Sequence, residues 1–202
     1  MSELSRRELL TSAAALWVSA CLPRPRALEA AAASSTPSAL TPAEWRTVEA
    51  IAARIVPTDH EPGAREAGAV NFIDKALAHE DAAALPRYRA ALRALDLVCR
   101  SRHDAAFEAL AHELQDALLR ELEDGAVSGW TGGDADPAAF FATVREHAIL
   151  GFLCEPARGG NRDYAGWRVV QFPGRVHELG GATPEQMLGQ TPFPTAWGGK
   201  IE

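Results

Sequence analysis

Apolar side chains recur every three or four residues in five successive segments between residues 42 and 153, and this spacing is what most constrains the fold. That period places them on one face of an α-helix, whereas a half-buried strand would alternate every second residue. A short apolar run at Trp167–Phe172 is long enough only for one strand or an extended arm. The sequence therefore predicts a mainly α protein, a small helical domain of about five helices with a long irregular C-terminal section.

The predicted helices have recognisable starts and ends. Thr41–Glu44 forms a capping box with proline at the first helical position, and Pro57 ends that first helix. Gly125 follows the fourth helix as a C-terminal cap. The five apolar faces comprise Trp45, Val48, Ile51, Ala52, Ile55 and Val56; Ala69, Phe72, Ile73, Ala76 and Leu77; Tyr88, Leu92, Leu95 and Cys99; Phe107, Leu110, Ala111, Leu114, Leu118 and Leu122; and Phe140, Phe141, Val144, Ala148 and Phe152.

The C-terminal section differs from the helical part. Glycine and proline become frequent after Pro156, which favours irregular backbone. A second capping box at Thr183–Gln186 predicts one or two further helical turns. The end of the chain, from Thr191, contains two prolines and is expected to be extended.

The first 36 residues resemble an export leader. Arg6 and Arg7 precede a modest apolar stretch, Leu9–Ala20, which is too short to span a bilayer. Consecutive arginines before such a stretch indicate the twin-arginine route of bacteria. We therefore expect residues 1–36 to be a signal peptide and leader, residues 37–202 to be the domain, and the mature protein to be periplasmic.

The site of signal cleavage is left open by two alternatives. Val18–Cys21 resembles a lipobox, which would make Cys21 the lipid-modified N-terminus of the mature chain. The alanine run at Ala31–Ala33 offers the small residues that an ordinary signal peptidase prefers.

Composition excludes several classes of function. The net charge of −7 argues against a nucleic-acid binder or a protein of anionic lipid surfaces, since both need a basic surface. The chain has neither a G-x-G-x-x-G dinucleotide motif nor a phosphate-binding loop, and it lacks a C-x-x-C-H haem motif and a G-x-S-x-G nucleophile elbow. No histidine follows a glutamate by three residues, as a di-iron helical bundle would require. We therefore assign no catalytic, cofactor-binding or metal-binding residue to this chain.

Residues 151–174, here called the glycine-rich segment, are unusually specific for a connecting loop. Gly and Asn supply left-handed backbone and side-chain hydrogen bonds, so a defined conformation is expected. Aromatic and arginine side chains such as Arg162, Trp167 and Phe172 suit a protein interface, and Asn161 and Cys154 belong to the same segment. The alternative is a structural loop whose Trp167 and Phe172 fold back on the helices.

Two separated motifs carry a resemblance to a known family. The first runs from Ile55-Val56-Pro57-Thr58-Asp59 through Pro62–Gly68 to Phe72-Ile73-Asp74, and the second is G-F-L-C-E-P, G-G-N-R-D, G-W and F-P-G within residues 151–174. Together they resemble the gluconate 2-dehydrogenase subunit 3 family over residues 40 to 175. Arg158 and Gln171 depart from the residues that are frequent there.

The resemblance implies a small, non-catalytic subunit of a membrane-associated dehydrogenase. In that family a large subunit carries FAD and oxidises a sugar, sugar acid or polyol, and a cytochrome c subunit with haem c commonly takes the electrons onward. The small subunit would act as export escort and stabiliser, and membrane association would come through the partner or a lipid anchor. Two other readings remain open: an exported enzyme acting alone, and a structural lipoprotein without a dehydrogenase partner.

Two cysteines remain after the leader. Cys99 lies on an apolar helical face and is expected to be a buried thiol. Pairing it with Cys154 would require their Cα atoms to lie within about 7 Å. Because free thiols tend to pair in an oxidising compartment, we expect Cys154 to pair with a cysteine of the large subunit or to pack in that interface.

Overall fold

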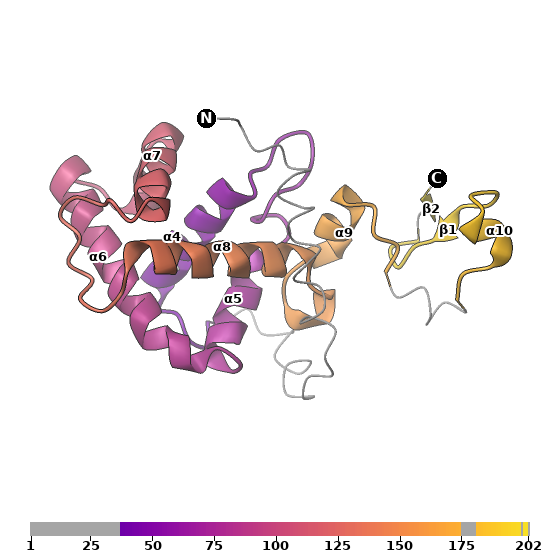
Figure 1. Cartoon of the computed structure of the whole chain (residues 1–202), viewed down its shortest axis with the longest axis horizontal. Coiled ribbons are helices and arrows are strands. Elements are labelled where there is room, and N and C mark those ends of the chain that lie inside the picture. The colour runs from indigo at the N-terminus through magenta and orange to yellow at the C-terminus, as the bar shows by residue number, and fades with distance from the viewer. Residues whose placement is uncertain (1–36, 175–180, 199, 202) are drawn as a thin grey trace.

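The computed structural model describes residues 37–174, 181–198, 200 and 201, and within them the protein is mainly α, as predicted (Figure 1). Five longer helices form the body, and two short ones follow. Their bounds are α4 Pro42–Ile55, α5 Ala69–Ala78, α6 Leu85–His103, α7 His112–Glu123, α8 Pro137–Leu153, α9 Ala165–Val169 and α10 Pro184–Met187. Single 3-10 turns lie at η2 Ala82–Ala84, η3 Phe107–Ala109, η4 Pro156–Arg158 and η5 Arg162–Tyr164.

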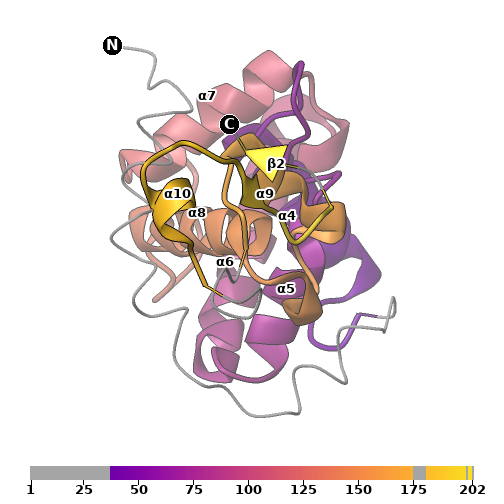
Figure 2. The same ribbon diagram turned by 90° about the vertical axis from the view of Figure 1, so that its right-hand side faces the viewer.

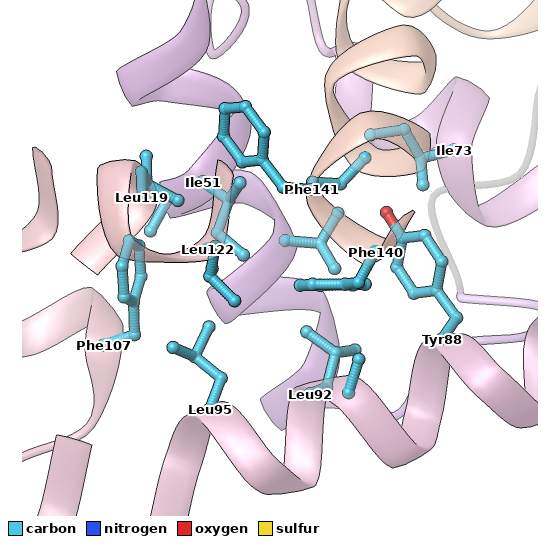
Figure 3. Packing of buried hydrophobic residues seen from close by; sticks show 14 of the residues in the cluster. Ile51, Ile73, Tyr88, Leu92, Leu95, Phe107, Leu119, Leu122, Phe140 and Phe141 are labelled. Atoms are coloured by element: carbon cyan, nitrogen blue, oxygen red, sulfur yellow. The ribbon is translucent and has the colours of Figure 1, made fainter. Parts of the chain in front are cut away.

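Helix α8 is the centre of the body. It packs against α4, α5, α6 and α7, and its buried residues lie around most of its circumference, as expected of a helix enclosed by others. Figure 3 shows Tyr88 and Leu92 on α6 directed toward Phe140 of α8. This core orients the C-terminal end of α8, where the glycine-rich segment begins.

The predicted helix caps are confirmed. The Thr41 hydroxyl accepts from the Glu44 amide at 3.3 Å, and the Glu44 carboxylate accepts from the Thr41 amide at 2.7 Å. Thr183 and Gln186 make the same reciprocal pair at the start of α10. Gly125 has a φ of +68° after α7, the left-handed conformation that a glycine cap supplies.

The fourth predicted helix is wrong in its first part. Phe107 lies on the separate turn η3, and the backbone at Leu110 and Ala111 is extended before α7 begins at His112. The side chain of Gln115 donates to the Phe107 carbonyl at 2.8 Å, which satisfies an acceptor that a continuous helix would have used. Both forms bury Phe107 and Leu110, so apolar spacing alone cannot tell them apart.

The strand or extended arm predicted at Trp167–Phe172 is also wrong. Residues 165 to 169 form α9, whose first amides are capped by Asn161, five and six residues earlier in the chain. Gln171 has a φ of +53°, and the Phe172 amide donates to the Trp167 carbonyl at 2.8 Å, so the run ends in a turn. The last segment is extended as predicted only at β1 Phe193–Pro194 and β2 Lys200–Ile201, which pair antiparallel, and the backbone turns at residues 195–198, where the Gly198 amide donates to the Thr195 carbonyl at 3.1 Å.

Beyond α9 the chain leaves the body. Figures 1 and 2 show α10 and the β1–β2 pair standing past α9 at one end of the long axis. Within the described residues, no helix combines the length and apolar character that crossing a bilayer requires.

Candidate partner interface

Asn161 organises the glycine-rich segment. Its backbone is left-handed, with φ +47° and ψ +41°, and the residue is fully buried. The side-chain amide donates to the Cys154 carbonyl at 2.8 Å, while the side-chain oxygen accepts from the amides of Gly166 at 2.8 Å and Trp167 at 3.4 Å. One side chain therefore joins the end of α8 to the start of α9.

Two glycines on either side of Asn161 allow the backbone to pack directly against the end of α8. A Cβ atom on Gly160 would lie 2.0 Å from the Gly151 carbonyl oxygen, and one on Gly166 would lie 1.9 Å from the Phe152 carbonyl oxygen. Both obstacles are backbone atoms of a packed helix, so neither can move aside cheaply. Helix α9 therefore lies against the end of α8 at a distance that only glycine permits.

Trp167 is enclosed by this arrangement. Its indole N–H donates to the Leu153 carbonyl at 2.7 Å, and the residue is 5% exposed. Its ring meets the edge of Phe172 with centroids 4.9 Å apart, and Tyr164 lies 5.5 Å away. Trp197 joins through Tyr164 at 6.3 Å. We call these four residues the aromatic cluster.

The two sequence motifs meet in space. The amide of Arg162 donates to the Ala67 carbonyl at 2.9 Å, and a Cβ on Gly151 would lie 2.7 Å from the Ala69 carbonyl oxygen. A Cβ on Gly68 would lie 3.0 Å from the guanidinium of Arg162, which therefore covers the start of α5. The motifs thus form one continuous junction.

The first motif is stabilised by its own loop contacts. The Glu66 carboxylate accepts from the Thr58 hydroxyl and from the Gly63 amide, at 2.9 Å for the latter. The hydrogen bond from Thr58 is the main cause of a lowered pKa for Glu66. The loop is therefore held in one conformation before α5 begins.

Asp74 fastens the N-terminal end of the described chain to α5. Its carboxylate is 2% exposed and accepts from three successive amides, those of Ser38 at 2.6 Å, Ala39 at 3.0 Å and Leu40 at 2.8 Å. Arg89 on α6 adds a hydrogen bond to the Ala39 carbonyl. We call this contact the N-terminal anchor.

Lys75 is a buried cation beside the junction. It is 3% exposed, and its ammonium has no hydrogen-bond partner among the described residues. The ammonium lies under Gly159, where a Cβ would come within 2.6 Å of it. Loss of hydration lowers the pKa of Lys75.

Cys99 and Cys154 are both free thiols, so the structure contains no bond between them. Cys154 as a residue is half-buried, and its sulfur lies 3.6 Å from the Gly151 carbonyl oxygen and beneath Gly160, where a Cβ would come within 3.0 Å of it. Burial raises the pKa of each thiol to about 12, which keeps both thiols un-ionised near neutral pH and slows their exchange reactions. Covalent pairing of Cys154 with a partner stays a prediction.

A family model described as gluconate 2-dehydrogenase subunit 3 matches residues 42–174, from the first residue of α4 to the end of the glycine-rich segment. The chain belongs to the gluconate 2-dehydrogenase subunit 3 family. The matched range contains the whole junction and stops before α10. No curated protein and no solved structure matched the chain.

Within this subunit 3 domain, the predicted interface residues separate into two groups. Asn161 and Trp167 are buried and shape the segment from inside. Arg162 is exposed and Phe172 is half-buried, so these two offer side-chain surface to a partner, whereas Cys154 is half-buried as a residue with its thiol turned into the protein. Contact with a partner stays a prediction for all five.

Three predicted residues lie outside the described structure, and two buried charged residues were not predicted to have a role. Arg6, Arg7 and Cys21 lie outside the described residues. Asp74 and Lys75 were not singled out for a role, although two adjacent charges within an apolar stripe are a visible signal. In the described part of the chain, no three His, Cys, Asp or Glu side chains are grouped closely enough to hold a metal.

Proposed function

We propose that this chain is the non-catalytic small subunit of a periplasmic, membrane-associated dehydrogenase complex. The observation that carries the proposal is the family match, because the family is described as a dehydrogenase subunit. FAD would be held by the large subunit, which would oxidise a sugar, sugar acid or polyol. A cytochrome c subunit with haem c would take the electrons onward.

The chain would serve the large subunit as its export escort. The paired Arg6 and Arg7 support this role, since the twin-arginine route carries folded proteins. A flavoprotein that has bound FAD in the cytoplasm would then cross the membrane attached to the partner that bears the signal. Membrane association would come through the partner or through a lipid on Cys21.

The junction supports binding because it is organised in advance. The Asn161 hydrogen bonds and the glycine contacts hold the loop in one conformation, so little conformational entropy remains to be lost on association. The exposed Arg162 guanidinium over the start of α5 is the kind of side chain that dominates binding energy in interfaces.

Replacing Arg6 and Arg7 with lysine tests the escort role. We expect both the small subunit and the dehydrogenase activity of its partner to remain in the cytoplasmic fraction of the source cells. The matched control replaces Arg24 and Arg26 with lysine, which changes the same residue type in the same leader outside the arginine pair. Full periplasmic activity in the Arg6 and Arg7 variant would contradict the proposal.

Purification of the mature chain by itself separates the proposal from an exported enzyme acting alone. We expect neither flavin absorbance nor sugar-dependent dye reduction from the isolated subunit. Catalytic turnover by the chain alone would overturn the assignment of a non-catalytic subunit.

A further inference from the structure

Residues 181–198, here called the arm, lie outside the range that matches the family. They carry α10 and β1, and Figure 1 shows them past α9, away from the helical body. Whatever the arm contributes is therefore additional to the domain that the family shares.

The base of the arm is fixed to the glycine-rich segment. The Ala196 amide donates to the Pro173 carbonyl at 2.9 Å, and Trp197 belongs to the aromatic cluster through Tyr164. Gly174 has a φ of +93°, and a Cβ there would lie 2.7 Å from the Cβ of Ala196. The arm thus leaves the body from a packed base that adjoins the proposed interface.

The tip of the arm exposes large apolar side chains. Met187 is 75% exposed and Leu188 is 71% exposed, against 57% for Leu97 and 39% for Leu114 in the body. Glu185 is the single charged residue between positions 181 and 198. Few charges together with methionine and aromatic residues are typical of the core of a protein interface.

These features point to a protein partner. Residues 181–198 contain no lysine or arginine and carry Glu185, and the whole chain is acidic, so even with Lys200 on the paired strand β2 the arm gains little electrostatic attraction to an anionic membrane surface. A dimer made by the tip alone would also be too small, because stable interfaces bury about 1,200–2,000 Å² in total. One helical turn with two apolar side chains suits a partner that is already held elsewhere.

We propose that Met187 and Leu188 insert into an apolar groove on the FAD-containing large subunit, as a second contact beside the junction. The inference rests on the proposed function. Because the arm and the junction belong to one chain, binding at one raises the effective concentration of the other, and the two weak contacts reinforce each other.

The test uses the full chain produced together with the large subunit of its source cells. The arm variant carries Met187→Glu and Leu188→Glu, and the control carries Leu97→Glu and Leu114→Glu on the body. After affinity purification through the small subunit, the retained large subunit is identified by mass spectrometry and quantified by flavin absorbance. We expect the arm variant to retain about tenfold less flavoprotein, with the control near wild type.

Several outcomes would overturn the inference. Equal retention by wild type and arm variant would do so, as would an equal loss in the control. If light scattering showed a dimer for the wild type and the control but a monomer for the arm variant, the tip would bind a second copy of the chain. If the wild type but not the arm variant floated with anionic vesicles, the tip would bind a membrane. If wild type retained no flavoprotein at all, the proposed function itself would fail.

The milder variant Met187→Gln with Leu188→Gln guards against a general effect of added charge. It removes the apolar surface of the tip without adding carboxylates. If this variant also retains less of the large subunit, the result supports insertion of the tip into an apolar groove. Full retention of the large subunit would show that the glutamates acted by repulsion and would overturn the inference.

Discussion

The helical body and the glycine-rich segment are stabilised in different ways. The body buries apolar side chains from five helices, and each of them is one of many that exclude water from a shared core. The glycine-rich segment depends on a few individual contacts. These are the hydrogen bonds of the Asn161 side chain and the close packing of Gly160 and Gly166 against backbone carbonyl groups. A body built on shared burial tolerates small changes, whereas a loop built on unique contacts does not.

Replacing Asn161 with alanine should have the largest effect. The change leaves the Cys154 carbonyl and the Gly166 amide buried without partners and places alanine in a left-handed conformation. These costs together are about 4 kcal/mol of unfolding free energy, measurable by urea denaturation. Asn161→Gly separates the two causes, because glycine accepts the backbone angles and loses only the hydrogen bonds. Losses that are equal in the two variants would show that backbone strain contributes nothing.

Changing a single methyl group in each region, by adding one at Gly166 and removing one at Ile51, compares the two regions directly. Gly166→Ala would place its Cβ against the Phe152 carbonyl oxygen, so α9 must separate from α8, at a cost of about 3 kcal/mol. Removing one methyl from the fully buried Ile51 of the body, as Ile51→Val, should cost about 1 kcal/mol. Equal losses in thermal unfolding would contradict the distinction between the two regions.

Replacing Lys75, which lies beneath the glycine-rich segment, should change the free energy of unfolding least, and it should raise that free energy where the other variants lower it. Lys75→Met removes a buried ammonium that has no hydrogen-bond partner among the described residues, and it should stabilise the domain by about 1 kcal/mol at neutral pH. The native pKa of Lys75 lies below its ordinary value of 10.5, so above the native pKa the unfolded chain binds a proton that the native chain does not. Stability of the wild type therefore rises with pH across that window.

A pH series of urea denaturations measures this difference. The advantage of Lys75→Met should be greatest below the native pKa of Lys75 and should shrink as the pH approaches 10.5. A constant difference across that range would mean that the ammonium is not the cause. Arg93→Met on the exposed side of α6 is the control for removing a cation from the surface.

The same distinction explains what could be predicted from the sequence. Period and capping identify the helices of the body, because those signals are local or repeat along one face. The break at Leu110 and the formation of α9 depend on Gln115 and Asn161, which act on backbone groups several residues away. The motifs could be recognised, but that they form one junction could be learned only from the structure.

The interface prediction shows a similar division. Composition selected Asn161 and Trp167 as partner contacts, yet their polar groups bond to the chain's own backbone. A buried asparagine and an exposed one have the same letter in the sequence, and only packing distinguishes them. Asp74 was missed for the converse reason, because its three amide partners lie 34 to 36 residues earlier in the chain.

The N-terminal anchor also bears on how the proposed leader would be removed. A peptidase requires a stretch of backbone whose amides are free to pair with its own binding cleft, and the amides from Ser38 to Leu40 are already bonded to Asp74. Trimming from the N-terminus should therefore stop ahead of Ser38. Cleavage before Cys21 and cleavage in the alanine run both fall ahead of that point. Either cut would leave the same folded domain, and the choice between them would decide only whether Cys21, the proposed lipidation site, stays attached to it.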